Sequence, residues 1–172
     1  MVDRRQRQMC IRDRVTLTGK GIKVGDQAPG FTLLDENLKD VNLSDYKGKV
    51  KLLSIFPSID TSVCSVQTRK FNVEAAKFGD KVVFIGISAD LPFALKRFCG
   101  AEGIDNLVVL SDHRKMDFGS KYGFQIEELR LLTRGVIIID ANDKVRYVEV
   151  VPEIVNEPNY DAAINELKKI VS

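Results

Sequence analysis

The sequence has no Trp, one His and three Cys among its 172 residues. So few cysteines and histidines exclude a disulfide-stabilised scaffold and argue against a structural zinc site. No apolar run approaches the ~20 residues that a membrane helix needs, which excludes a membrane-spanning protein. The glycines do not form the strand, G-x-x-x-x-G-K-[S/T] and helix sequence of a phosphate-binding loop.

What the sequence does contain is enough for one globular domain. Hydrophobic residues make up 44% of the chain and charged residues 29%, a balance that excludes overall disorder. The length suits a single hydrophobic core. The formal charge is only +2, which argues against nucleic-acid binding. We therefore expect neither a nucleic acid nor a membrane as a partner.

The small basic excess is confined to the first fourteen residues. They carry five Arg and two Asp, which leaves residues 15–172 with 21 Lys+Arg against 22 Asp+Glu. One interpretation of this segment is a basic arm for nucleic acid or anionic lipid. The segment lacks the ~7–15-residue apolar stretch of a signal peptide, so we expect a cytoplasmic protein.

Another interpretation explains the first residues better. Residues 4–13 read RRQRQMCIRD, which is the translation of a common transposase sequencing-library adapter. We therefore expect residues 1–14 to be a non-native or disordered tail and residues 15–172 to form one domain. The tail includes Cys10, for which we predict no role.

Continuous apolar runs are typical of strands that are buried on both faces of a sheet. They predict three such strands, VKLLSIF at 50–56, VVFIGIS at 82–88 and NLVVLSD at 106–112. Shorter segments that alternate around turn residues predict paired strands. These segments lie at 15–26, 31–49 and 135–151.

Helical patterns follow the buried strands and close the chain. In residues 63–78 the apolar residues at roughly helical spacing are Val63, Val66, Val73, Ala76 and Phe78. Further helices are predicted at 91–103 and 159–171, with a short helix or turn at 116–123. This order of elements predicts a three-layer α/β domain with a mixed sheet, compatible with a thioredoxin-like topology.

Cys64 is the residue that most strongly indicates chemistry. It follows the strand 50–56, Pro57 and Thr61, and it falls in the first turn of the next helix. The unpaired N–H groups and the dipole of a helix N-terminus favour a thiolate over a thiol, and the thiolate is the reactive form. The alternative is a buried cysteine that acts as a small apolar side chain.

Residues 57–64, PSIDTSVC, match the peroxiredoxin active-site pattern P-x-x-x-[T/S]-x-x-C at every fixed position. The wider run 56–72 resembles the thiol peroxidase branch, the atypical 2-Cys peroxiredoxins. So do segments at 86–104, 111–114, 131–134 and 157–164. The resemblance implies a thioredoxin-like fold with an N-terminal hairpin, and a thiol-dependent peroxidase that needs no metal, haem or flavin cofactor.

The resemblance also implies roles for single residues. Cys64 is the peroxidatic cysteine, which a hydroperoxide oxidises to a sulfenic acid. Thr61 hydrogen-bonds the thiolate and the peroxide through its hydroxyl, Pro57 shields the sulfur from water, and Arg134 holds the thiolate and the incoming oxygens. Without the resemblance, Thr61 is equally a helix cap, Pro57 a strand terminator and Arg134 a solvated strand-end residue. Arg69 is a competing cation that we rank second.

Cys99 is the resolving cysteine by the same resemblance. It attacks the Cys64 sulfenic acid to give an intramolecular disulfide, which a thioredoxin-like protein reduces. Two sulfurs on different helices must approach to about 2.05 Å, so we predict local unwinding around Cys64, Cys99 or both. The lack of a C-x-x-C pair disfavours a thioredoxin-type oxidoreductase. The resemblance implies a homodimer as well.

Two other functions stay open from the sequence alone. The enzyme could be a one-cysteine peroxidase in which Cys99 is structural. It could also be a redox sensor or binding protein that passes its oxidation to a partner without turnover. A purely structural protein leaves the PSIDTSVC match unexplained. His113, the only histidine, has no motif around it for a Cys–His protease.

Overall fold

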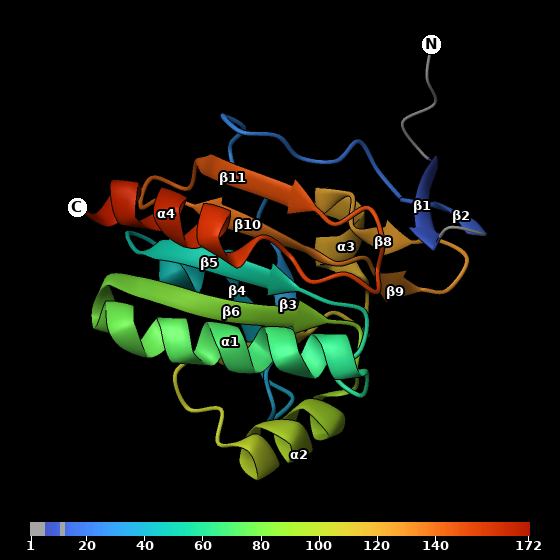
Figure 1. Ribbon diagram of the computed structural model, residues 1–172, viewed down its shortest axis with the longest axis horizontal. Coiled ribbons are helices and arrows are strands. Elements are labelled where there is room, and N and C mark those ends of the chain that lie inside the picture. The colour runs from blue at the N-terminus through green and yellow to red at the C-terminus, as the bar shows by residue number, and fades with distance from the viewer. Residues whose placement is uncertain (1–5, 11–12) are drawn as a thin grey trace.

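The computed structural model describes residues 6–10 and 13–172, which form a sheet with helices on both faces (Figure 1). In these residues the main sheet has seven strands in the order β11-β10-β5-β6-β7-β3-β4. Their bounds are β3 Thr32–Leu34, β4 Asp40–Asn42, β5 Val50–Ile55, β6 Val82–Ser88, β7 Val108–Ser111, β10 Gly135–Ile139 and β11 Val145–Val150. The predicted mixed sheet is confirmed.

The middle of the sheet is parallel and its flanks are antiparallel. β5, β6 and β7 run parallel, whereas β10 is antiparallel to β5 and β3 is antiparallel to β7. All residues of β5 and β10 are buried, as their apolar runs predict. Lys51 and Ser54 are the polar exceptions in β5. The fully buried Lys51 ammonium lies 2.5 Å from the Asp143 carboxylate. This pairing compensates the buried charge.

Helices cover both faces of the sheet. α1 Ser62–Phe78, α2 Pro92–Glu102 and α4 Tyr160–Val171 lie on one face, and α3 Asp117–Tyr122 lies on the other (Figure 1). The short 3-10 helix η1 Leu43–Tyr46 connects β4 to β5, and a second, η2 Gly79–Lys81, connects α1 to β6. Phe71, Phe84 and Leu167 pack together beneath α1 and α4. Burial of such side chains is the main force that holds the helices on the sheet.

The buried face of α1 differs from the predicted one. Its buried residues are Cys64, Gln67, Thr68, Phe71 and Ala75, not the valine-rich stripe that apolar spacing predicts. Val73 is 58% exposed and Ala76 is exposed as well. The reason is that the polar members of the buried face are fully hydrogen-bonded: the Thr68 hydroxyl donates to the Cys64 carbonyl, and Gln67 serves the site described below.

The N-terminal hairpin lies earlier in the chain than predicted. β1 Gln6–Cys10 pairs with β2 Asp13–Thr16, so a hairpin within residues 15–26 is wrong. The reason is that Gly19 and Gly21 have φ of +86° and +75°, which interrupts an extended strand. Residues 1–5 and 11–12 of the predicted tail lie outside the described residues, and the origin of the tail stays a prediction.

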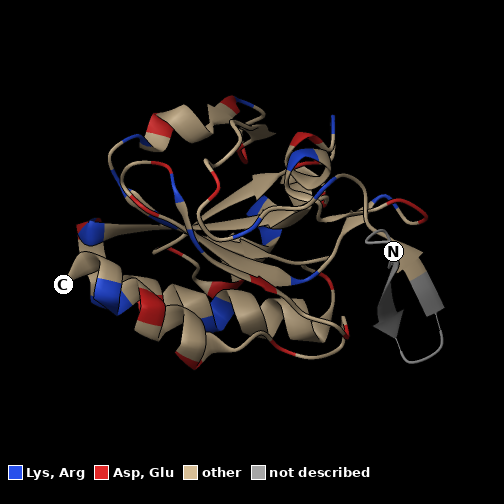
Figure 2. Cartoon of the chain, turned by 90° about the horizontal axis from the view of Figure 1, so that it is seen from above, with Lys and Arg blue, Asp and Glu red and all other residues tan. Residues whose placement is uncertain are grey.

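A second short hairpin, β8 Gln125–Ile126 with β9 Leu131–Leu132, precedes β10. Two-residue strands carry no periodicity, so the sequence does not predict them. Figure 2 shows acidic and basic residues interspersed over the helices and loops, with most of the sheet free of charge. In this view the described residues therefore form no surface that is only basic or only acidic.

Candidate active site

Cys64 lies at the point where a buried strand turns into a helix. Pro57, which is buried, lies two residues after the end of β5, and Thr61 takes an extended conformation as the N-cap of α1. The Thr61 hydroxyl accepts a hydrogen bond from the Cys64 amide at 3.4 Å and lies 2.7 Å from the Cys64 sulfur. Both alternatives for Thr61 are thus realised at once: it caps the helix and it contacts the sulfur.

Arg134 reaches the same sulfur from another part of the chain. It immediately precedes β10, whose first residue Gly135 pairs with Ile55 at the end of β5. This register brings the end of β5 and the start of β10 to one edge of the sheet. Nη2 of Arg134 lies 3.2 Å from the Cys64 sulfur, and the side chain is 1% exposed. It is therefore not a solvated strand-end residue.

The partners of the Arg134 guanidinium explain how a cation is tolerated here. Among the described residues, Nε donates to the Ile154 carbonyl at 2.9 Å, Nη1 to the Gln67 side-chain oxygen at 2.6 Å and Nη2 to the Cys64 sulfur. Two of these acceptors are neutral amide oxygens. Because a buried charge needs hydrogen-bond partners, these three contacts hold the guanidinium against the Cys64 sulfur.

Gln67 is a site residue that the sequence reasoning missed. Its side chain is fully buried, and its amide nitrogen donates to the Ser54 hydroxyl at 2.8 Å and to the Ile55 carbonyl at 3.2 Å. These bonds fix the oxygen that holds Arg134. Gln67 lies three residues after Cys64, so the two side chains share a helix face; a polar residue at that spacing is the signal that could have found it.

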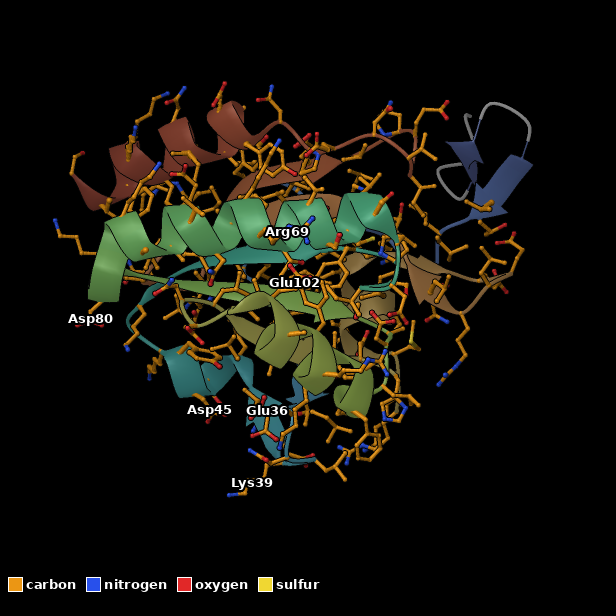
Figure 3. All side chains as sticks on the ribbon, turned by 60° about the horizontal axis from the view of Figure 1, so that its bottom comes forward. Glu36, Lys39, Asp45, Arg69, Asp80 and Glu102 are labelled. Atoms are coloured by element: carbon orange, nitrogen blue, oxygen red, sulfur yellow. The ribbon has the colours of Figure 1, made fainter. Side chains whose placement is uncertain are left out.

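Arg69, the competing cation, points elsewhere. Its Nη1 donates to Glu102 at 2.9 Å, and both side chains are more than a third exposed. Figure 3 shows this pair between α1 and α2, on the surface of the molecule. The geometry therefore places Arg134, and not Arg69, at the sulfur.

Cys99 lies on α2 in a half-buried position, and Cys64 and Cys99 are both free thiols. It packs against the apolar cluster that contains Cys64 together with Phe56, Ile59, Leu95 and Val109. Burial raises the pKa of the Cys99 thiol to about 11, and the carboxylates of Glu36 and Asp105 add to the rise. In this arrangement Cys99 is a protonated and therefore weak nucleophile.

A polar network on α1 and α4 lies beside the site. Lys70 donates to Glu157 at 2.9 Å and sits 4.5 Å above the Tyr160 ring. The Tyr160 hydroxyl also donates to Glu157 at 2.9 Å. The hydrogen bonds from Lys70 and then Tyr160 lower the pKa of the Glu157 carboxyl. The network ties the start of α4 to the helix that carries Cys64.

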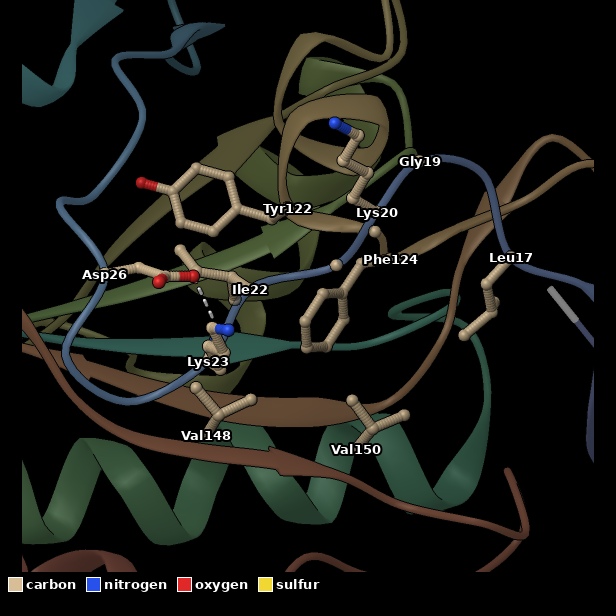
Figure 4. Close-up of a pocket in the computed structure, with 12 residues that line it drawn as sticks. Leu17, Gly19, Lys20, Ile22, Lys23, Asp26, Tyr122, Phe124, Val148 and Val150 are labelled. Atoms are coloured by element: carbon tan, nitrogen blue, oxygen red, sulfur yellow. Dashed lines mark hydrogen bonds between the residues drawn. The ribbon is translucent and has the colours of Figure 1, made fainter. Parts of the chain in front are cut away.

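A separate pocket of about 680 Å³ lies between the N-terminal segment and β11 (Figure 4). Lys20, Lys23, Phe124 and Val148 are among its lining residues. Neither Cys64 nor Cys99 lines it, so this pocket is separate from the site around Cys64. In the described part of the chain, no helix is long and apolar enough to cross a membrane, and no three His, Cys, Asp or Glu residues are grouped as metal ligands.

Comparisons with known proteins identify the family of the chain. The pattern of the Redoxin family matches residues 23–164. The chain is 57% identical to a thiol peroxidase of Oceanobacillus iheyensis, over 91% of this chain and 95% of that protein. It is 56% identical to the thiol peroxidase of Bacillus subtilis, over 91% and 93% of the two chains.

A solved structure supports the same assignment. The peroxiredoxin-like protein of Aquifex aeolicus superposes with a TM-score of 0.90 at 40% identity, over 97% of this chain and 98% of that one. The expected thioredoxin-like fold is confirmed. The chain belongs to the redoxin family and is a thiol-dependent peroxidase of the peroxiredoxin type.

Proposed function

We propose that the enzyme reduces hydrogen peroxide and organic hydroperoxides through Cys64 as its peroxidatic cysteine. One observation carries this proposal: the buried Cys64 sulfur lies between the Thr61 hydroxyl at 2.7 Å and the Arg134 guanidinium at 3.2 Å. A sulfur anion and two fixed donors are what an attack on a peroxide bond requires, because negative charge moves from sulfur to the leaving oxygen.

In the first step the Cys64 thiolate attacks the terminal oxygen of the hydroperoxide. The O–O bond breaks, the sulfur becomes a sulfenic acid, and the other oxygen leaves and takes up a proton as water or an alcohol. Sulfur loses two electrons and the peroxide gains them. Arg134 and Thr61 stabilise the negative charge in this step, and Pro57 keeps water away from the sulfur.

In the second step the Cys99 sulfur attacks the Cys64 sulfenic acid. The thiol proton and the sulfenic hydroxyl leave as water, and an intramolecular Cys64–Cys99 disulfide forms. The geometry of a disulfide requires Cα atoms within about 7 Å of each other. We propose that α1 or α2 unwinds locally to reach it. A thioredoxin-like dithiol protein then reduces the disulfide and is itself oxidised.

Peptide mapping after oxidation tests this sequence of steps. The reduced full chain is treated with an excess of hydrogen peroxide, because a sulfinic acid consumes two molecules of peroxide per thiol, and it is then alkylated and digested. A linked Cys64–Cys99 peptide supports the intramolecular disulfide, whereas a sulfinic Cys64 with an unlinked Cys99 supports a one-cysteine peroxidase. Sustained peroxide consumption with thioredoxin, thioredoxin reductase and NADPH excludes a sensor without turnover.

We propose that the enzyme is a cytoplasmic homodimer. The exposed apolar residues Leu91 and Phe93, 53% and 64% exposed at the start of α2, support a dimer surface. Light scattering coupled to size-exclusion chromatography tests the oligomeric state.

We propose that residues 4–14 derive from a sequencing adapter. Resequencing the locus by a method without that adapter tests this origin, and finding the same codons would refute it.

A further inference from the structure

Asp90 lies in the segment between β6 and α2 and has no part in the steps above. Its carboxylate accepts three hydrogen bonds: from the Ser58 hydroxyl at 2.9 Å, from the Ile59 amide at 2.7 Å and from the Ser88 hydroxyl at 2.7 Å. Ser58 and Ile59 belong to the loop in front of Cys64. We call the Asp90 carboxylate with these three donors the Asp90 clasp.

The clasp is anchored in the rigid part of the sheet. The Asp90 amide donates to the Ser88 hydroxyl at 3.2 Å, and the Ser111 hydroxyl donates to the Asp90 carbonyl. Ser88 and Ser111 are both buried and pair with each other between β6 and β7. The carboxylate therefore has a fixed position to which the loop in front of Cys64 is tied.

From the clasp a chain of hydrogen bonds runs to the reacting sulfur. The Ser58 carbonyl accepts the Thr61 amide at 3.2 Å and lies 3.1 Å from the Thr61 hydroxyl. That hydroxyl lies 2.7 Å from the Cys64 sulfur. Because a hydroxyl has one hydrogen, Thr61 donates either to the Ser58 carbonyl or to the sulfur. The bond from the Thr61 amide to the Ser58 carbonyl is compatible with both cases, so it is this bond that ties the position of Thr61 to that of Ser58.

We propose that Asp90 is a positioning residue for peroxide reduction, which fixes Ser58 and thereby holds the Thr61 hydroxyl against the Cys64 sulfur. The inference rests on the proposed role of Cys64. A carboxylate suits this task because it accepts from a backbone amide and two hydroxyls with two oxygens. An Asn side chain has only one acceptor oxygen. Oδ1 of Asp90 accepts from the Ser58 hydroxyl, whereas Oδ2 accepts from both the Ile59 amide and the Ser88 hydroxyl. Asp90→Asn therefore removes the acceptor either of Ser58 or of Ile59 and Ser88.

The test measures the oxidation of Cys64 in a single turnover. Reduced full chain is mixed with hydrogen peroxide, quenched with an alkylating reagent and followed by mass spectrometry. We expect Asp90→Asn to slow the loss of the Cys64 thiol about tenfold, since a small misplacement of a catalytic donor has effects of this order. Formation of the disulfide after oxidation is not slowed, because that step uses no donor from Thr61.

Asp140→Asn is the matched control. Asp140 also accepts two backbone amides, from Asn142 and Lys144, but at the other end of β10 from Arg134. It carries the same change of charge and a comparable loss of hydrogen bonds. We expect the Cys64 thiol of this variant to react with hydrogen peroxide at the wild-type rate. An equal slowing in both variants would show a general effect on stability and overturn the proposal.

A second variant tests the path through Thr61. Thr61→Val removes the hydroxyl that Asp90 is proposed to position. Adding Asp90→Asn to this variant should therefore change the rate of Cys64 oxidation by less than about twofold. If the two changes instead multiply, Asp90 acts by another route and the inference is wrong. Ser58→Ala gives the same readout should Asp90→Asn fail to fold. A wild-type chain whose Cys64 does not react would refute the proposed function itself, whereas a reactive wild type and an equally reactive Asp90→Asn refute only this inference.

Discussion

Nη2 of Arg134 lies 3.2 Å from the sulfur of Cys64, although the two residues are 70 positions apart in the sequence. The antiparallel register of β10 with β5 produces this approach, because it sets Gly135 opposite Ile55. The Cys64 sulfur thus contacts both the buried Arg134 guanidinium and the Thr61 hydroxyl. Changes to these contacts should therefore alter the rate at which peroxide oxidises Cys64.

Arg134→Lys keeps a positive charge but removes the planar set of donors that reaches the sulfur and Gln67 at once. We expect the rate of Cys64 oxidation by peroxide to fall about 100-fold, the size of effect seen when a fixed donor is lost from a transition state. Stopped-flow measurement of the single-turnover rate checks this. Arg146→Lys, at a half-exposed position paired with Asp140, should retain the full rate.

Gln67→Leu conserves side-chain volume but deprives Arg134 of the oxygen that orients its Nη1. We expect oxidation of Cys64 to slow about tenfold, because one buried hydrogen bond to a charged group is lost. The same assay is used, with Gln27→Leu at an exposed position as the control. A normal rate in Gln67→Leu would mean that Arg134 is positioned without Gln67.

Cys99 should be unreactive towards alkylation at neutral pH in the folded protein. Burial, with Glu36 and Asp105, raises the pKa of its thiol to about 11, so only about 0.1% is thiolate at pH 8. In a Cys64→Ser variant, the rate of iodoacetamide modification of the Cys99 peptide should rise with pH up to about 11. A pH profile with a midpoint at about 8.5, the pKa of an unperturbed thiol, contradicts the buried placement of Cys99.

Asp112 should make the folded protein less stable as the pH rises through about 6. Burial raises the pKa of this carboxyl from 3.8 to about 6, although the amides of Gly119 and Phe118 donate to it. Between these two values the folded state holds a proton that the unfolded state has released. The stability that this proton provides is present below pH 4 and is lost above pH 6, by about 3 kcal/mol.

Urea unfolding of wild type and Asp112→Asn at pH 4.5 and pH 7.5 measures this effect. The free energy of unfolding of wild type, relative to Asp112→Asn, should fall between the two pH values, because all other carboxyls cancel in the comparison. Asp105→Asn, at an exposed position, should show no such change. A difference that does not vary with pH would contradict a raised pKa of Asp112.

The parts of the fold that the sequence predicts are those encoded by local patterns. Strands β5 and β6 match the predicted runs because continuous apolar residues suit a doubly covered sheet,. α2 begins at Pro92, as a proline in the first turn predicts,. It runs past Gly100, the predicted stop, and ends before Gly103, which takes the left-handed conformation,. The helix cap by Thr61 is also a local pattern, since the capping side chain lies three residues before the Cys64 amide that it binds,.

What the sequence could not predict depends on long-range register and on buried polar groups. Arg134 was reached only through the resemblance, because its contact with Cys64 needs the pairing of β10 with β5. Gln67 was missed because apolar spacing assigns valines, not amides, to the buried face of α1. Asp90 acts through contacts 31 and 32 residues away, which no local pattern reveals.

The most direct test of the account is peroxide turnover coupled to thioredoxin, measured for wild type, Cys64→Ser and Cys99→Ser. We expect Cys64→Ser to lose all turnover, because no other described cysteine has the Arg134 and Thr61 donors at its sulfur. Cys99→Ser should still oxidise once at Cys64 but fail to cycle with thioredoxin. Full coupled activity in Cys64→Ser would contradict the assignment of Cys64 as the reacting residue.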